Sequence, residues 1–103
     1  MFGTVARMSL KPGMESRFQD LMREYEGLDI PGFVATYVYR MDDNTNEFYL
    51  ATVWRDRDSY FANANSPAQD ARFRKMRDLL TGEPEWHDGE IVYSQTGART
   101  MSR

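Results

Sequence analysis

The stretch VWRDRDSYFANANSPAQDARF, Val53 to Phe73, decides how this chain folds. An apolar, strand-like run ends at Trp54, and charged residues follow it. Asp56 is placed to cap a short helix, and residues 66–69 (SPAQ) have the form of a capping box with proline at the first helical position. The stretch therefore predicts a strand followed by two short helices. Whether its Trp, Tyr and Asn residues also handle a small molecule depends on the rest of the chain.

Before this stretch the sequence alternates between strand and helix patterns. Phe2 to Leu10 alternates with a period of two and predicts a strand. Pro12 suits a first helical turn, and Gly27 suits a helix stop. The apolar residues between them recur every three or four positions, which predicts an amphipathic helix: Met14, Phe18, Leu21, Met22 and Tyr25.

Two further strands follow the Pro31-Gly32 turn. Phe33 to Met41 and Glu47 to Trp54 are rich in β-branched and aromatic residues, and the polar segment DDNTN between them predicts a hairpin. After the second of the two short helices, Glu90 to Ser94 predicts a last strand.

The predicted order is β-α-β-β-α-β, with the second α element split in two. This is an α+β, ferredoxin-like arrangement in which helices pack on one face of a four-stranded antiparallel sheet. A chain of 103 residues has room for one such domain, which we assign to residues 1–94. The polar tail, residues 95–103, is expected to be frayed or draped over a partner.

The strand from Phe33 is apolar on both sides. Tyr37 and Tyr39 lie on one side of it, and Val34, Thr36 and Val38 lie on the other. Since helices cover only one face of the sheet, the second face needs another cover. We therefore expect a homodimer, with the two sheets face to face.

The composition excludes several classes of protein. The net charge is −3 with both signs interspersed, whereas a nucleic-acid-binding surface needs clustered positive charge. There is no cysteine, which excludes disulfides, thiolate nucleophiles and Cys-ligated metals. No apolar run has the length of a signal peptide or a membrane span, so we expect a cytoplasmic protein that does not bind membranes.

Four segments together resemble a known family: VARMSLKPGMESRFQDLMREY, PGFVATYVYR, EFYLATVWRDRDSYFANANSP and PEWHDGEIVY. They resemble the antibiotic biosynthesis monooxygenase family over about the first 94 residues. The resemblance implies a dimeric α+β barrel with a pocket between the concave face of the sheet and the helices. Several members of that family oxidise phenols or quinols with O2 and without metal or flavin, and others degrade haem.

Matched positions refine what the resemblance implies. Trp54 falls where members often place a Trp at the end of the third strand, and Asn63 falls where many carry a His. The haem-degrading branch needs an Asn on the first strand and a His on the last long helix. The segments FGTVARMSL and AQDARFRKMRDLL contain neither, which argues against haem degradation.

Each candidate catalytic residue has a structural alternative. Trp54 could stack on a planar substrate and donate its N–H, or it could be packing at a strand end. Asn63 could donate to a developing oxyanion, and Asn65 could contact substrate, but both could simply form the turn before Ser66. His87, the only histidine, suits a general base by its titration near neutrality, or it is a turn or interface residue.

The remaining candidates would bind substrate. Tyr37 and Tyr60 could line the pocket, although tyrosines also favour strands and dimer packing. Arg72 could reach an anionic substrate, although a solvated surface position explains it better. A metal site at His87 would need further ligands, so we predict no metal and no other cofactor.

These observations lead to two hypotheses. The first is a cofactor-independent monooxygenase that binds a phenolic or quinol substrate as its anion and lets that anion react with O2. The second is a non-catalytic, dimeric small-molecule-binding or structural protein of the same fold.

Overall fold

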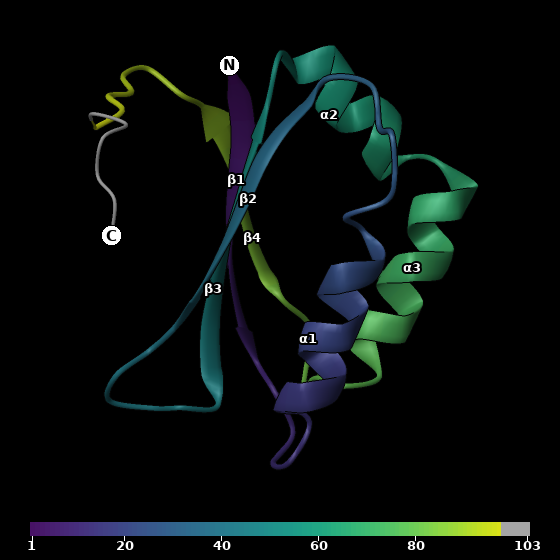
Figure 1. Ribbon diagram of the computed structural model, residues 1–103, viewed down its shortest axis with the longest axis vertical. Coiled ribbons are helices and arrows are strands. Elements are labelled where there is room, and N and C mark those ends of the chain that lie inside the picture. Colours follow the sequence, from purple (N-terminus) through teal and green to yellow (C-terminus); the bar gives the residue numbers. More distant parts are fainter. Residues whose placement is uncertain (98–103) are drawn as a thin grey trace.

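A computed structural model describes residues 1–97 and shows one layer of helices on one layer of sheet (Figure 1). The α+β, ferredoxin-like fold with a split second helix is confirmed. The elements are β1 (Phe2–Ser9), α1 (Glu15–Glu24), β2 (Phe33–Arg40), β3 (Glu47–Trp54), α2 (Arg57–Ala64), α3 (Pro67–Arg77) and β4 (Glu85–Glu90). The predicted domain, residues 1–94, contains all of them, and residues 98–103 of the predicted tail lie outside the described part.

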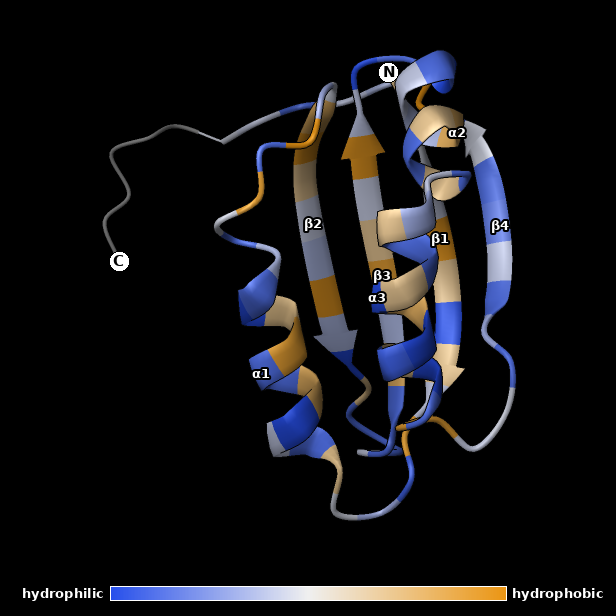
Figure 2. Cartoon of the chain, turned by 90° about the vertical axis from the view of Figure 1, so that its right-hand side faces the viewer, coloured by the Kyte–Doolittle hydropathy of each residue, from blue (hydrophilic) through white to orange (hydrophobic). Residues whose placement is uncertain are grey.

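The sheet is antiparallel with strand order β2-β3-β1-β4. Figure 2 shows all three helices in front of this sheet, with α1 on the side of β2 and α2 and α3 towards β1 and β4. The face without helices, here called the outer face, is the other side of the same strands (Figure 1). None of the helices within residues 1–97 is long and apolar enough to cross a membrane.

The split of the second helix has the predicted local cause. The Asp56 carboxylate accepts a hydrogen bond from the Ser59 backbone N–H at 2.8 Å and caps α2. The Ser66 hydroxyl accepts from the Gln69 N–H at 3.1 Å and caps α3, where Pro67 takes the first position. Two separate caps within ten residues of each other fix the angle between the two helices.

The predicted ends of α1 were wrong at both sides. The helix begins at Glu15, after Pro12, because Gly13 has φ +81° and left-handed backbone cannot continue a helix. It ends at Glu24, and Gly27 lies in the following turn without a positive φ. The helix is therefore shorter than its apolar periodicity suggested.

The last strand was also misplaced, since β4 spans Glu85–Glu90 instead of Glu90 to Ser94. The prediction followed the β-branched and aromatic residues Ile91, Val92 and Tyr93. In the structure β4 pairs with β1, and that ladder ends where Phe2 faces Glu90. One hydrogen bond, from the Ile91 N–H to the Met1 carbonyl, continues beyond it. Val92 and Tyr93 are left exposed.

The hydrophobic core occupies one end of the space between sheet and helices. Side chains from β1, β3, α1 and α3 fill it; the buried members are Ala6, Met8, Leu10, Phe18, Leu21, Phe48, Leu50, Met76 and Leu80. Phe18 packs on Phe48 with ring centroids 5.4 Å apart. This end is the one where β1 leads into α1 and α3 ends. The opposite end, beneath α2, is not filled in the same way.

Candidate active site

A cavity of about 710 Å³ lies between the sheet and the helices, beside the core. Its walls come from β1, β2, β3 and β4 on one side and from the three helices and the segment before β2 on the other. Most of its lining is apolar: Met22, Leu28, Ile30, Phe33, Val38, Leu50, Trp54, Phe61, Phe73, Met76 and Trp86. A volume of this size, with few polar groups, is typical of a site for a small organic ligand.

Aromatic rings close the end of the cavity under α2. Trp54 packs on Phe33 with centroids 5.3 Å apart and on Tyr60 at 6.0 Å, both edge to face. Phe2 lies 5.3 Å from Tyr60 and 5.7 Å from Phe61. These five residues are here called the aromatic cluster. All of them except Phe2 line the cavity and would offer ring faces and edges to a planar ligand.

A line of polar side chains crosses the sheet beside the aromatic cluster. Thr36 faces Thr52, Thr52 faces Thr4, and Thr4 faces Asp88 across successive pairs of strands. All four line the cavity. The next facing positions on either side are mostly apolar, with Phe33, Trp54 and Phe2 on one side. We call Thr36, Thr52, Thr4 and Asp88 the polar row.

Tyr60 of α2 reaches this row. Its hydroxyl donates to Asp88 Oδ1 at 2.7 Å. Burial, and then the bond to the Asp88 carboxylate, raise the pKa of Tyr60 to about 12, while the nearby Thr4 hydroxyl partly offsets them. Tyr60 is therefore a neutral donor at any physiological pH, and the carboxylate of Asp88 is its acceptor.

The Thr4 hydroxyl is the buried polar group without a partner in the described residues. Thr4 is 4% exposed, and its Oγ1 makes no hydrogen bond of normal geometry, although Tyr60 lies close by. Leaving a buried hydroxyl unpaired is unfavourable, by about 1 to 3 kcal/mol. A ligand atom in the cavity would remove that cost.

Three of the predicted site residues line the cavity together: Trp54, Tyr60 and Asn63. The Trp54 indole N–H donates to Thr52 Oγ1 at 3.2 Å, so the ring is held in orientation by the polar row. Trp54 is also buried, so it packs at the end of its strand as well as lining the cavity. From the sequence, packing and a place in the site were alternatives.

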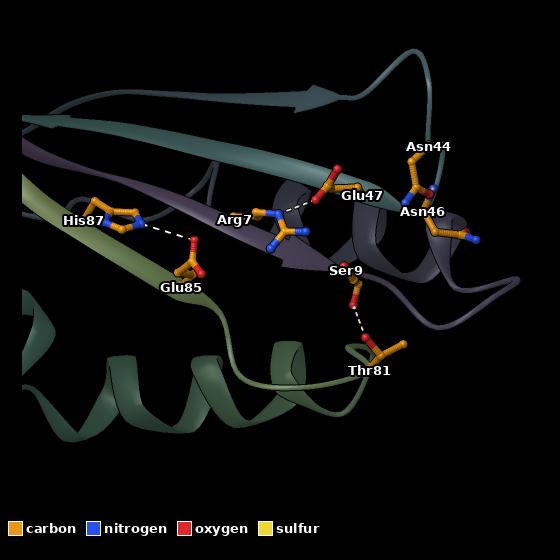
Figure 3. A network of polar contacts seen from close by, with 8 residues as sticks. All are labelled: Arg7, Ser9, Asn44, Asn46, Glu47, Thr81, Glu85 and His87. Atoms are coloured by element: carbon orange, nitrogen blue, oxygen red, sulfur yellow. Dashed lines mark hydrogen bonds and ion pairs between the residues drawn. The ribbon is translucent and has the colours of Figure 1, made fainter.

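Tyr37 and His87 lie on the outer face, away from the cavity. Tyr37 of β2 is 58% exposed there, because it alternates with Thr36 and Val38, which point inward. His87 of β4 alternates in the same way with Trp86 and Asp88, and its Nε2 lies 3.3 Å from Glu85 Oε1 (Figure 3). Neither residue is brought to Trp54.

Asn65 and Arg72 are also outside the cavity lining. Asn65 is the last residue of the α2 turn, where its N–H bonds back to the helix. The Arg72 guanidinium lies 5.4 Å from the centroid of the Tyr25 ring and donates to Gln69 Oε1 at 3.1 Å. It therefore stands behind two residues that line the cavity, and it borders a smaller depression beside α2.

Sequence reasoning missed Thr4, Thr52 and Asp88. The alternation in Phe2 to Leu10 already placed Thr4 among apolar neighbours on one side of its strand, which was a usable signal. Asp88 gave none, because the last strand was placed after it. Within residues 1–97, no three His, Cys, Asp or Glu side chains are close enough to hold a metal ion together.

The model of the family "Antibiotic biosynthesis monooxygenase" matches residues 1–75, which is most of the chain and includes Trp54, Tyr60 and Asn63. The chain belongs to the antibiotic biosynthesis monooxygenase family. No curated protein sequence matches it.

Solved structures share the fold of this family member at low sequence identity. SnoaB, a cofactor-independent oxygenase from Streptomyces nogalater, seen as a point mutant, aligns with TM-score 0.78 and 20% identity over 90% of this chain and 94% of that one. A conserved protein from Methanosarcina mazei Go1 aligns with TM-score 0.75 and 22% identity over 85% and 89%. NE2512, a protein of unknown function from Nitrosomonas europaea, aligns with TM-score 0.74 and 19% identity over 94% of both chains.

Proposed function

We propose that this family member is a cofactor-independent monooxygenase that oxidises a phenolic or quinol ring with O2. The observation that carries the proposal is the cavity itself, in which the aromatic cluster adjoins a row of hydroxyls and a carboxylate. Family membership and the described activity of SnoaB support it.

The chemistry asks little of the protein beyond binding and proton transfer. A phenol that loses its proton becomes an electron-rich ring, which passes an electron to O2 and then forms a carbon–oxygen bond with the reduced oxygen. Loss of water from the ring hydroperoxide leaves a quinone, so one phenol and one O2 give one quinone and one water. The residues around the ring then orient it, exclude water and stabilise the developing charge.

Three residues would share these tasks. Trp54 would stack on the ring, held in place by its bond to Thr52. The Asn63 amide would donate to a developing oxyanion from the α2 side of the cavity. Tyr60 would accept a hydrogen bond from a ring hydroxyl while its own hydroxyl stays bonded to Asp88.

Oxygen uptake by the metal- and flavin-free protein tests the proposal. The protein is offered a panel of hydroquinones and polycyclic phenols, and uptake is compared with autoxidation of each compound. We expect uptake above that background, and a loss of about a hundredfold or more in Asn63→Ala, the usual cost of removing one such donor. Trp54→Phe should lose uptake as well.

Asn46→Ala is the matched control, because Asn46 lies in the exposed β2–β3 hairpin (Figure 3) and should leave uptake unchanged. No uptake with any compound in the panel would contradict the proposal and favour the non-catalytic binding protein.

We also propose that two copies of the chain associate through the outer face. Val5, Tyr37 and Tyr39 are all about half exposed there, and such a patch is unusual on a monomer. A second copy of the sheet has the matching surface by symmetry.

A further inference from the structure

The charged residues that line the cavity are all acidic. They are Glu26 before β2, Asp70 on α3 and Asp88 on β4. Within residues 1–97 no lysine, arginine or histidine side chain belongs to the lining. A ligand with a carboxylate or sulfonate group would thus meet only charges of its own sign on the walls.

Three arginines lie near the cavity without lining it. Arg74 pairs with Asp70 at 3.0 Å, which leaves Asp88 and Glu26 as the two lining carboxylates without an ion pair among the described residues. Arg57 lies over the rings of Phe2 and Phe61, at 5.3 and 4.9 Å from their centroids, and does not belong to the lining. Arg72 stands behind Tyr25, as described above.

The polar row provides the complementary half of the site. The buried Thr4 hydroxyl is unpartnered, and Asp88 and Thr52 lie on the strands on either side of it. Neighbouring strands are about 4.8 Å apart. The two oxygens of a 1,4-dihydroxy aromatic ring are somewhat farther apart than this, so one can hydrogen-bond to Thr4 while the other hydrogen-bonds to Thr52.

We propose that the cavity selects an uncharged dihydroxy aromatic compound, which binds Thr4 through a ring hydroxyl and gives that hydroxyl's proton to Asp88. This inference rests on the proposed function, because it takes an aromatic ring as the ligand. It replaces the expectation that substrate arrives as an anion: the ring arrives neutral and becomes an anion only inside the cavity.

The proton step conserves the charge of the site. The ligand hydroxyl donates to the Tyr60 oxygen as the Tyr60 proton moves to Asp88 Oδ1, along the bond already present. The ligand is then an anion, Asp88 is a neutral carboxylic acid, and Tyr60 is unchanged. Asp88 lies on the edge strand and is exposed, so it can return the proton to water. The negative charge moves from the carboxylate to the ring, and none is added to the cavity.

The test is a binding measurement that needs no turnover. Binding of 1,4-dihydroxynaphthalene and of 1,4-dihydroxy-2-naphthoate is followed under argon by calorimetry, near pH 7. These probes differ only in the carboxylate. We expect the neutral probe to bind more tightly by about fivefold or more, and Asp88→Asn to reduce that ratio towards one.

Thr4 is tested by isosteric replacement. Thr4→Val should weaken binding of the neutral probe about fivefold, which corresponds to about 1 kcal/mol. Its melting temperature should not fall, because the change removes a buried unpaired hydroxyl. Thr4→Ser keeps the hydroxyl and should bind as the unchanged protein does. The matched controls are Thr81→Val and Asp43→Asn, both outside the cavity.

Two results would overturn the inference: tighter binding of the naphthoate, or binding of the neutral probe that is unchanged in Thr4→Val. Either could be found in a protein that still consumes O2. Conversely, selective binding through Thr4 without oxygen uptake would refute the monooxygenase proposal and leave this inference standing.

Discussion

Tyr60 shows how much a single side chain depends on its neighbours. Its place at the start of a short helix after Trp54 could be predicted, because the caps are local sequence signals. Its hydrogen bond to Asp88 could not, since it joins residues 28 positions apart in the chain and depends on the register of an edge strand. Asp88 was missed for the same reason, whereas Thr4 had a local signal in the alternation of its own strand.

The raised pKa of Tyr60 can be measured directly. Of the six tyrosines, one should titrate near pH 12 in a spectrophotometric titration of the phenolate, and this step should be missing in Tyr60→Phe. Asp88→Asn should lower the pKa of Tyr60, but not to its usual value of 10.0, because burial is the larger cause. A titration in Asp88→Asn identical to that of the unchanged protein would show that the bond is absent in solution.

At the scale of elements, the helices were predicted best where capping is local. The N-terminal caps of α2 and α3 are the predicted ones, Asp56 and Ser66. The start of α1 and the position of β4 differ from the prediction. The start of α1 depends on the conformation of Gly13, and β4 depends on where β1 has residues left to pair. Neither is encoded in the apolar pattern of the segment itself.

The α2 cap also predicts a pH dependence. Hydrogen bonds from Ser59, side chain first, and then Arg55 lower the pKa of Asp56 to about 2 from a usual value of 3.8. The stabilisation by Asp56 is therefore fully present above about pH 4 and is lost as the pH falls through about 2. Asp56→Ala should lower the melting temperature at pH 7, and the difference from the unchanged protein should narrow between pH 4 and pH 2.

Asp56→Asn separates capping from charge. Asparagine caps helices about as well as aspartate, so this variant should remain stable at pH 7 and lose less stability on acidification. An Asp56→Ala variant with an unchanged melting temperature would show that the cap does not hold α2 in place.

For the whole molecule, the sequence predicted the layers but not where the empty space would be. The family resemblance placed a pocket between the sheet and the helices, and the cavity is there. That only one end is hollow follows from side-chain sizes and rotamers across four strands and three helices, which no single segment contains. Tyr37 was a candidate for lining the pocket, but its strand is apolar on both sides, and the alternation alone did not say which side faces the helices.

The proposed association through the outer face predicts a mass of twice 12.1 kDa in sedimentation velocity. Tyr37→Lys should shift the equilibrium towards the monomer, because it places a charge within the apolar patch that forms the proposed interface. Gln19→Lys adds the same charge to the exposed surface of α1 and should leave the mass unchanged. A monomer at high protein concentration without any substitution would refute the association.

The separation of a packed end from a hollow end has a consequence for how this fold can diversify. Backbone pairing holds the polar row and the cavity walls in position whichever side chains they carry, and the core that stabilises the domain lies apart from most of them. Substitutions at lining positions other than the buried aromatic residues can therefore change which ligand is accepted with little loss of folding free energy. Neighbours with 22% identity or less that keep the same architecture are what such freedom would produce over evolutionary time.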